Sequence, residues 1–280
     1  MFKIQHMKRI AIFCITYNSY NELRRYLISL DVAAGHAKSC FDVDVYVIDN
    51  TETDFEEIDY LTSFKNITCL LYPHHKNLGY FGGARSVMST VDLSGYEYVA
   101  VTNVDLVASE DLFANLSKAE LGDGVGWIAI SIQSEKEGRD RNPSVLKRYS
   151  ERKLKLLKFK FKVPIVDHVY NNTLYKRKRI GKKYPQMDIY AGHGSFILLT
   201  REYFQKCGMI EYPVFLFGEE LYLAEQCREH SLRVVYCPSV VVYDSEHVST
   251  NKMSRAISFK QTFYYKCNEA AINFILKNYY

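Results

Sequence analysis

A short apolar run that ends in Asn103-Val104-Asp105 constrains how this chain folds. The run, from Tyr98 to Thr102, does not alternate with polar residues, which is typical of a strand buried on both faces of a sheet. In an open α/β sheet, ligands bind outside the carboxyl ends of such strands. A carboxylate there is suited to hold a divalent cation against a diphosphate, because hard cations prefer oxygen ligands. The sequence therefore predicts a ligand site at Asp105.

Strand-like and helix-like segments alternate through the first half of the chain, which predicts right-handed βαβ units on a mostly parallel sheet flanked by helices. Ser19 to Glu22 fits a capping box at the start of the first helix. The expected strands lie at 8–15, 43–48, 67–72, 98–102 and 125–132, with a second helix from 82 to about 90. Later segments predict strands at 195–200 and 233–243 and helices at 219–228 and 254–280.

The length of 280 residues is enough for one large α/β domain with a sizeable core. We expect that domain to span residues 1–253, followed by a C-terminal helix over 254–280. Residues 145–183 form an inserted basic segment, with fourteen Lys or Arg and two acidic residues, although the whole chain has a net charge of only +4. The first part, to Lys158, fits an amphipathic helix, and 159–163 alternates like a strand.

The basic segment predicts an anionic partner, because leucines and phenylalanines lie between its charges in an otherwise mildly acidic chain. An anionic phospholipid surface fits this pattern, and a solvated face or a site for a phosphorylated acceptor are the alternatives. No stretch approaches the roughly 18 apolar residues of a spanning helix, and the N-terminus does not predict a signal peptide. Seven scattered cysteines without a Cys-x-x-Cys motif predict free thiols and no zinc site. We therefore expect a cytoplasmic protein, peripheral at the inner face of the cell membrane if the lipid hypothesis holds.

Five short motifs occur in a fixed order along the chain. They are Thr16-Tyr17-Asn18-Ser19, Asp49-Asn50, the glycine-rich segment from Asn77 to Arg85, Asn103-Val104-Asp105 and Gly218-Glu219-Glu220. Their order and spacing resemble the family 2 glycosyltransferases of the GT-A fold, particularly their rhamnosyltransferase-like branch. The resemblance covers roughly residues 8–133 and 188–250, and the late His of that branch corresponds to His247. Glu220 stands where the family usually has Asp, and Arg85 stands where Asn is commoner.

The resemblance implies an inverting, metal-dependent glycosyltransferase that acts in the synthesis of bacterial surface polysaccharides. It would move a sugar from a dTDP- or UDP-sugar, with dTDP-rhamnose as one donor, to a hydroxyl of a glycan or lipid-linked glycan. Glu220 takes the position of the catalytic base, with Glu219 as the second choice. Asp105 and His247 would hold Mg²⁺ or Mn²⁺. A structural alternative is open for the two glutamates, because the helix dipole favours acids in a first turn.

The remaining site residues are expected to bind the donor nucleotide. Asp49 matches the family position that accepts the imide N–H of uracil or thymine, which a carboxylate can do, and Tyr17 would stack on the base. The glycine-rich segment has neither the dinucleotide nor the ATP-binding pattern. Simple turn or helix-start roles are alternatives for Asp49 and Arg85. The predicted donor-binding set is Thr16, Tyr17, Asn18, Asp49, Asn77, Gly79, Gly82, Arg85 and Asn103.

Two other functions explain part of the sequence. A sugar nucleotidyltransferase shares the nucleotide-binding half of the sheet, but it usually has a glycine-rich basic loop after its first strand, and this chain has Thr16-Tyr17-Asn18-Ser19 there. A nucleic-acid-binding protein would use the basic segment. It would leave Asp49, Asp105 and Glu220 unexplained, so no nucleic-acid partner is expected. Gly192-His193-Gly194 is expected close to the acceptor.

Overall fold

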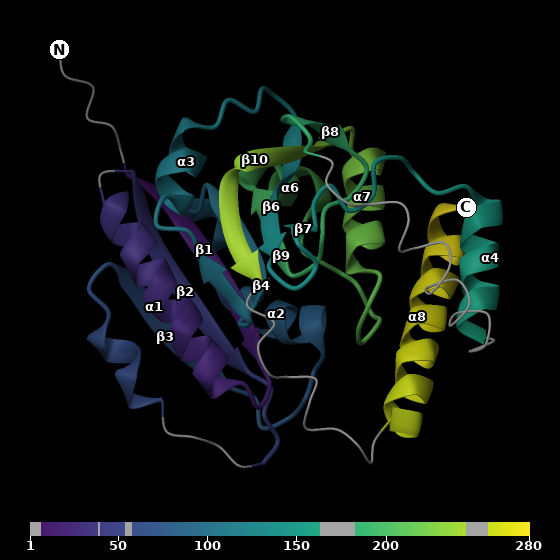
Figure 1. Cartoon of the computed structure of the whole chain (residues 1–280), viewed down its shortest axis with the longest axis horizontal. Helices are drawn as coiled ribbons and strands as arrows, with labels where there is room; N and C mark the ends of the chain where they lie inside the picture. Colours follow the sequence, from purple (N-terminus) through teal and green to yellow (C-terminus); the bar gives the residue numbers. More distant parts are fainter. Residues whose placement is uncertain (1–6, 39, 54–57, 163–182, 245–256) are drawn as a thin grey trace.

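The computed structural model describes residues 7–38, 40–53, 58–162, 183–244 and 257–280, and it has a mixed α/β architecture (Figure 1). The described strands form one ten-stranded sheet, in which the main path runs β3-β2-β1-β4-β9-β6-β10-β5. Its first half is parallel and comprises β1 (Lys8–Thr16), β2 (Phe41–Asp49), β3 (Ile67–Pro73) and β4 (Tyr98–Asn103). This half agrees with the predicted βαβ units.

The second half of the sheet is mixed. Strand β9 (Phe196–Thr200) lies antiparallel between β4 and β6 (Val125–Ser134), and β10 (Arg233–Asp244) runs parallel to β6. Three short strands pair antiparallel at the margins, namely β5 (Leu106–Ala108) and β8 (Met187–Ile189) with β10, and β7 (Arg139–Asp140) with β6. Because β9 reverses direction, β4, β6 and β10 all end at the same edge of the sheet.

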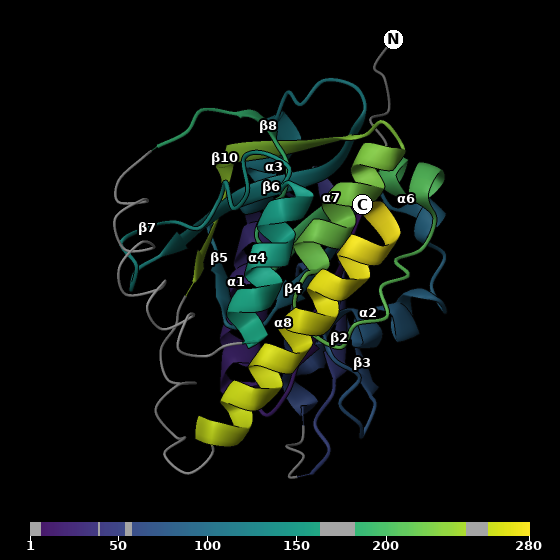
Figure 2. The same cartoon turned by 90° about the vertical axis from the view of Figure 1, so that its right-hand side faces the viewer.

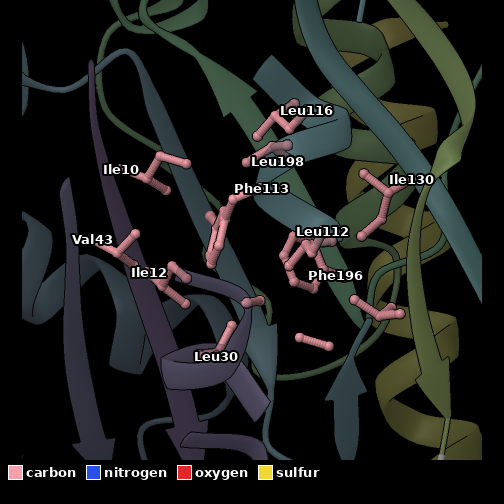
Figure 3. Close-up of a cluster of buried hydrophobic side chains, with 14 of the residues drawn as sticks. Ile10, Ile12, Leu30, Val43, Leu112, Phe113, Leu116, Ile130, Phe196 and Leu198 are labelled. Carbon is pink, nitrogen blue, oxygen red and sulfur yellow. The ribbon is translucent and has the colours of Figure 1, made fainter. Parts of the chain in front are cut away.

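Helices cover both faces of the sheet. One face packs on α1 (Tyr20–His36) and α3 (Leu112–Lys118). Figure 3 shows part of that core, where Ile12 of β1, Leu30 of α1 and Phe113 of α3 gather around the strands. The opposite face packs on α2 (Tyr80–Met88), α6 (Arg201–Cys207) and α7 (Glu219–Glu229). Two short 3₁₀ turns lie at Asp59–Ser63 and Leu93–Gly95.

Two more helices form an outer layer beyond α7. Figure 2 shows α7, α8 (Ile257–Tyr279) and α4 (Glu151–Lys162) side by side. The 23-residue α8 confirms the predicted C-terminal helix, and the expected first residues 254–256 lie outside the described part of the chain. Within the described part of the chain, no helix is both long enough and apolar enough to cross a membrane.

Two local predictions are wrong. Ser19 is the N-cap of α1, but its side chain makes no capping hydrogen bond, because its hydroxyl donates to the carbonyl of Tyr17 instead. Residues 159–162 belong to helix α4 and not to a strand. Every second residue there is apolar, yet Leu154, Leu157 and Phe161 also recur at helical spacing and pack in the α8 layer. Packing on a neighbouring helix therefore decides the conformation.

Candidate active site

The polar residues that follow β1, β2 and β4 meet at one edge of the sheet. Thr16 is in register with Asp49, and Ile15 with Asn103, so the three strand ends are adjacent. The buried carboxylate of Asp49 accepts hydrogen bonds from the Tyr20 hydroxyl at 2.8 Å and from the Thr51 N–H at 2.9 Å. Asp49 therefore fixes the start of α1 and the turn after β2. A nucleotide base could donate to Asp49 only through a carboxylate lone pair that these two hydrogen bonds do not use.

The glycine-rich segment is held against this edge by side chains of the earlier turns. Gly79 donates its N–H to Oδ1 of Asn77, and its carbonyl accepts from Nδ2 of the buried Asn50. Gly79 has a φ of +75°, and a Cβ there would lie 2.2 Å from the carbonyl oxygen of Phe215. Both observations require glycine. Asn77 and Gly79 thus shape the start of α2 and bring it against the segment before α7.

Tyr80 connects the donor side of the site to the acid-bearing helix. Its buried hydroxyl lies 2.9 Å from the carbonyl oxygen of Val101 in β4 and 2.8 Å from that of Gly194. Burial raises the pKa of this hydroxyl well above its usual value, and Glu219, Glu220 and Asp105 are close enough to raise it further. The predicted metal ligand and both predicted bases therefore share one electrostatic neighbourhood around a single tyrosine.

Two adjacent glutamates form the first turn of α7. Gly218, at φ +82°, starts the helix, and a Cβ there would lie 2.7 Å from Cβ of Ala271 in α8. Glu219 is buried, and Glu220 is half-buried with its Oε1 accepting from the Gly194 N–H at 3.2 Å. Burial and the charge of Glu220 raise the pKa of Glu219, and burial raises the pKa of Glu220. Carboxylates with raised pKa values suit proton transfer near neutral pH.

Asp105 lies half-buried between β4 and β5, at the edge where a ligand would approach. The antiparallel pair β10–β5 sets Asp244 opposite Leu106, one residue from Asp105. His247 lies outside the described residues. Among the residues that are described, no group of three or more His, Cys, Asp or Glu is arranged to hold a metal ion. Among the described residues, Asp105 offers one carboxylate to a hard cation such as Mg²⁺ or Mn²⁺. The diphosphate of the nucleotide would have to supply the other oxygen ligands.

The other predicted donor-binding residues differ in accessibility. Thr16 is fully buried, so its side chain cannot face a nucleotide. Tyr17 is exposed, as a base-stacking ring requires, and its hydroxyl lies 3.5 Å from Glu52. Asn18 has a φ of 51°, and its N–H donates to Oγ1 of Thr51. Gly82 and Arg85 lie within α2, and the Arg85 side chain is exposed.

Sequence reasoning missed Tyr80 and the reason for Gly194. In the sequence Tyr80 is only one residue of the glycine-rich segment, and nothing in its neighbours indicates a hydroxyl that contacts both Val101 of β4 and Gly194 of the loop before β9. Gly194 is required because a Cβ there would lie 2.7 Å from Oε1 of Glu220. The two glycines around His193 were the available signal. They place the loop before β9 directly against the predicted base, and its position near the acceptor stays a prediction.

Two surface cavities lie elsewhere on the molecule. One, of about 520 Å³, is lined by Tyr98, Val125 and Thr200 at the opposite edge of the sheet. The other, of about 350 Å³, is lined by Ser131, Asp140 and their neighbours. Neither cavity is lined by a predicted site residue. The candidate site is instead defined by the strand ends and helix starts that meet at one edge of the sheet.

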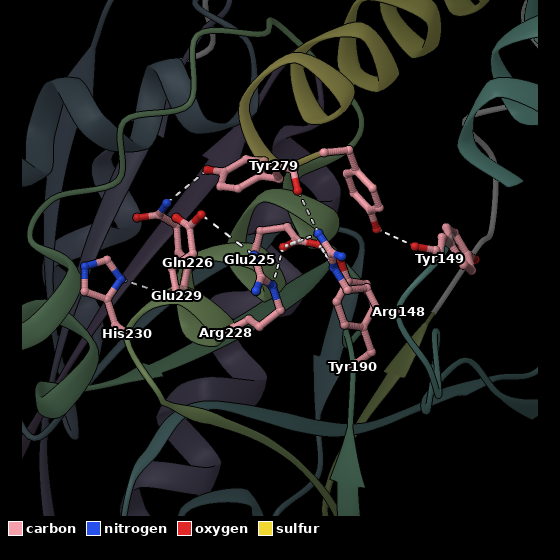
Figure 4. Close-up of polar contacts among 10 residues, drawn as sticks. Arg148, Tyr149, Tyr190, Glu225, Gln226, Arg228, Glu229, His230 and Tyr279 are labelled. Atoms are coloured by element: carbon pink, nitrogen blue, oxygen red, sulfur yellow. Dashed lines mark hydrogen bonds and ion pairs between the residues drawn. The ribbon is translucent and has the colours of Figure 1, made fainter. Parts of the chain in front are cut away.

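A buried ion pair anchors the acid-bearing helix (Figure 4). The Glu225 carboxylate, fully buried in α7, accepts from Arg148 at 2.7 and 3.1 Å, from Arg228 at 2.6 Å and from the Tyr190 hydroxyl at 2.5 Å. Arg148 also donates to the carbonyl of Tyr279 at the end of α8. Burial tends to raise the pKa of Glu225, but these hydrogen bonds lower it below its usual value. The network joins the segment before α4, helix α7 and the end of α8.

Solved glycosyltransferase structures resemble this fold at low sequence identity. GalNAc-T7 with UDP, GalNAc and Mn²⁺ aligns with a TM-score of 0.54 and 11% identity over 90% of this chain and 46% of that one. TarS of S. aureus aligns with a TM-score of 0.51 and 12% identity over 85% of this chain and 37% of that one. The catalytic domain of Drosophila β1,4-galactosyltransferase 7 with xylobiose aligns with a TM-score of 0.43 and 12% identity over 87% of this chain and 67% of that one.

This chain resembles these proteins in structure and not in sequence. No family model matches the sequence, and the search of curated proteins finds no relative. The chain spans less than half the length of GalNAc-T7 and of TarS. Together with the curled mixed sheet, its flanking helices and its C-terminal helix, these two structures show that the chain has the GT-A type fold.

Proposed function

We propose that this chain is an inverting, metal-dependent glycosyltransferase of the family 2 type. It would transfer a sugar from a dTDP- or UDP-sugar to a hydroxyl of a glycan or lipid-linked glycan. The observation that supports this most is that Gly194, in the loop before β9, contacts both Oε1 of Glu220 and the hydroxyl of Tyr80 in the glycine-rich segment. In a GT-A fold, a candidate base that lies beside the predicted donor-binding segment suits transfer of a sugar to an acceptor hydroxyl.

The donor would bind at the ends of the parallel strands. Tyr17 is exposed for stacking on the base, whereas Asp49 is buried and shapes the turn on which the base would rest. The backbone of Gly79, which has no side chain, would allow close approach of the diphosphate. Arg85 is exposed at the end of α2, and its charge would favour an anionic donor.

Asp105 would hold the cation, and the oxygens of the diphosphate would complete the shell. When bound, Mg²⁺ or Mn²⁺ stabilises the negative charge that gathers on the departing diphosphate. The Mn²⁺ in the GalNAc-T7 structure is consistent with divalent-metal use in this fold. His247 is a further candidate ligand that lies outside the described residues.

Glu220 would remove the proton from the acceptor hydroxyl. Its Oε1 is oriented by the Gly194 N–H, and burial raises its pKa, so it holds a proton more readily than an exposed glutamate. One carboxylate that activates a hydroxyl for in-line attack on the anomeric carbon produces inversion. Glu219 is the second candidate, although it is more deeply buried. A reducing cytoplasm fits the seven cysteines, none of which forms a disulfide.

Thermal unfolding with a panel of nucleotides tests this function. A ligand that binds the folded state raises the unfolding temperature by mass action. We expect UDP- or dTDP-sugars to stabilise the protein in the presence of Mn²⁺, and the shift to fall when EDTA replaces the metal. GDP-mannose and ATP are the matched controls. Absence of any shift with every UDP- and dTDP-sugar, at millimolar concentration with Mn²⁺, would contradict the proposal.

A further inference from the structure

Helix α4 has two apolar faces, and only one of them is used for folding. Leu154, Leu157 and Phe161 recur three to four residues apart, so they share one side of the helix. Leu154 is buried, and the Phe161 ring packs edge-on against Tyr264 of α8 with their centroids 5.8 Å apart. This inner face attaches α4 to the molecule.

Leu156 and Phe159 lie on the opposite face. They are three residues apart, and their exposed fractions of 64% and 55% are the highest among the large hydrophobic residues described. Figure 1 shows α4 at the margin of the molecule with α8 on its inner side, so no other described element covers this outer face. Folding therefore leaves two large apolar side chains together in water.

Cationic side chains surround these two residues. At 3.6 residues per turn, Lys155 and Lys162 lie along one side of the apolar pair and Lys153 and Lys160 along the other, with Arg152 one turn before Leu156. The helix contains a single acid, Glu151, which pairs with Lys155 at the surface. Lys162 also pairs with Glu269 of α8, whereas the long stems of the other cations let their charges reach outward beside the apolar pair.

We propose that this outer face of α4 docks on an anionic lipid bilayer, with Leu156 and Phe159 inserted at the headgroup level. An apolar centre between two rows of lysines is the pattern of a helix that lies in the plane of a membrane interface. Charge complementarity selects an anionic surface, because the negative potential of such a bilayer attracts each nearby Lys or Arg. The attraction falls off within a Debye length, so docking is reversible by salt.

Aromatic contacts link the inner face of α4 to the segment that precedes the candidate base. Phe161 contacts Tyr264, and Tyr264 contacts Phe217 with ring centroids 5.1 Å apart. Phe217 lies two residues before Glu219. These ring contacts connect the inner face of α4, opposite the proposed lipid-facing side, to the segment before α7. Vesicle binding itself is measured without a donor, so it does not depend on the proposed function.

The test is flotation of the full chain with vesicles of phosphatidylcholine alone or mixed with phosphatidylglycerol, at low and high salt. We expect wild type to bind only the mixed vesicles, at low salt, and the L156S/F159S variant to bind at least tenfold more weakly. The matched control is I28S/V32S on α1, which removes two apolar residues of 49% and 40% exposure. For charge, R152Q/K155Q/K160Q is compared with K38Q/K65Q/K118Q, which changes three exposed lysines elsewhere.

A fluorescent variant reports insertion directly. The chain has one tryptophan, the buried Trp127, so F159W adds a single exposed reporter. Its emission should shift to shorter wavelength, and brominated lipids should quench it, only with anionic vesicles. Thermal unfolding of each variant verifies folding, and nucleotide binding measured in parallel reports on the enzyme function separately. Equal binding of L156S/F159S and wild type, or no binding of wild type to anionic vesicles, would overturn the proposal.

Discussion

The backbone N–H of Gly194 donates to Oε1 of Glu220 across 3.2 Å and joins the loop before β9 to the first turn of α7. The same glycine offers its carbonyl to the Tyr80 hydroxyl at 2.8 Å. One residue without a side chain thus connects the start of α2, on the donor side, with the candidate base. The backbone of the loop before β9 therefore orients the carboxylate of Glu220.

Glu220→Gln should lower kcat by roughly 10²–10⁴, the usual effect of losing a general base, because glutamine keeps the shape but cannot take a proton. Donor affinity should change little, since the substitution leaves the strand ends intact. Steady-state kinetics and nucleotide titration measure the two effects. Glu229→Gln, at the exposed end of the same helix, is the control. If Glu219→Gln abolishes turnover and Glu220→Gln does not, the base is the neighbouring residue.

Glu219 should make folding stability depend on pH. Burial and the charge of Glu220 raise its pKa above the ordinary 4.5, so the folded state keeps a proton that the unfolded state has already released. Its contribution is therefore complete below about pH 4.5 and is lost as the pH rises toward the folded-state pKa, by at most about 1.4 kcal/mol per pH unit.

Urea unfolding at pH 5, 6.5 and 8 measures this effect. Glu219→Gln carries no titrating group, so its stability relative to wild type should increase steadily with pH. A difference between the two proteins that is the same at all three pH values would show that Glu219 titrates normally.

The positions of the strands along the first half of the chain and the residues at their ends follow from the sequence, because buried strands leave continuous apolar runs and parallel strands align their carboxyl ends. The register of Thr16 with Asp49 illustrates this. The short strand β5 could not be foreseen, since Leu106–Ala108 becomes a strand only by pairing with β10, far along the chain.

The sequence does not predict contacts between residues that are far apart along the chain. The sequence identifies Glu219 and Glu220 as candidates, but nothing local reveals that Tyr80 lies beside them or that Tyr20 binds Asp49. The α4 conformation was misjudged for the same reason. Alternation of lysine with leucine or phenylalanine fits a strand, but packing against α8 stabilises this segment as a helix.

Gly79→Ala should destabilise the fold more than Gly208→Ala. The two glycines have nearly equal φ values of +75° and +74°, so the left-handed backbone alone costs each alanine about 1–2 kcal/mol. At Gly208 the added Cβ meets nothing within 4 Å, whereas at Gly79 it would lie 2.2 Å from the carbonyl oxygen of Phe215. Urea unfolding should therefore show the larger loss at Gly79. Equal losses would mean that the turn moves away from Phe215 without cost.

Asp105→Ala should remove the Mn²⁺-dependent part of the affinity for UDP or dTDP, because the described residues contain no group of three or more His, Cys, Asp or Glu that could hold the metal in its place. Isothermal titration with nucleotide, with Mn²⁺ and with EDTA, separates the two parts. Asp111→Ala, an exposed aspartate without a side-chain capping bond, is the control. Undiminished transfer by wild type in EDTA would exclude the metal role of Asp105.

Glu225→Gln should destabilise the protein by about 3 kcal/mol, near the lower end for a buried ion pair that loses one partner, because Arg148 and Arg228 are partly in water. The matched control is Glu202→Gln, which breaks the exposed pair with Lys206 and should cost about 0.3–0.5 kcal/mol. Hydrogen bonds lower the pKa of Glu225, so its contribution is present above the ordinary glutamate pKa and is lost as the pH falls through the folded-state value. Urea unfolding should therefore show the two proteins converging in acid. A gap that persists at pH 2 would mean that packing, and not the charge of Glu225, holds α7 to α8.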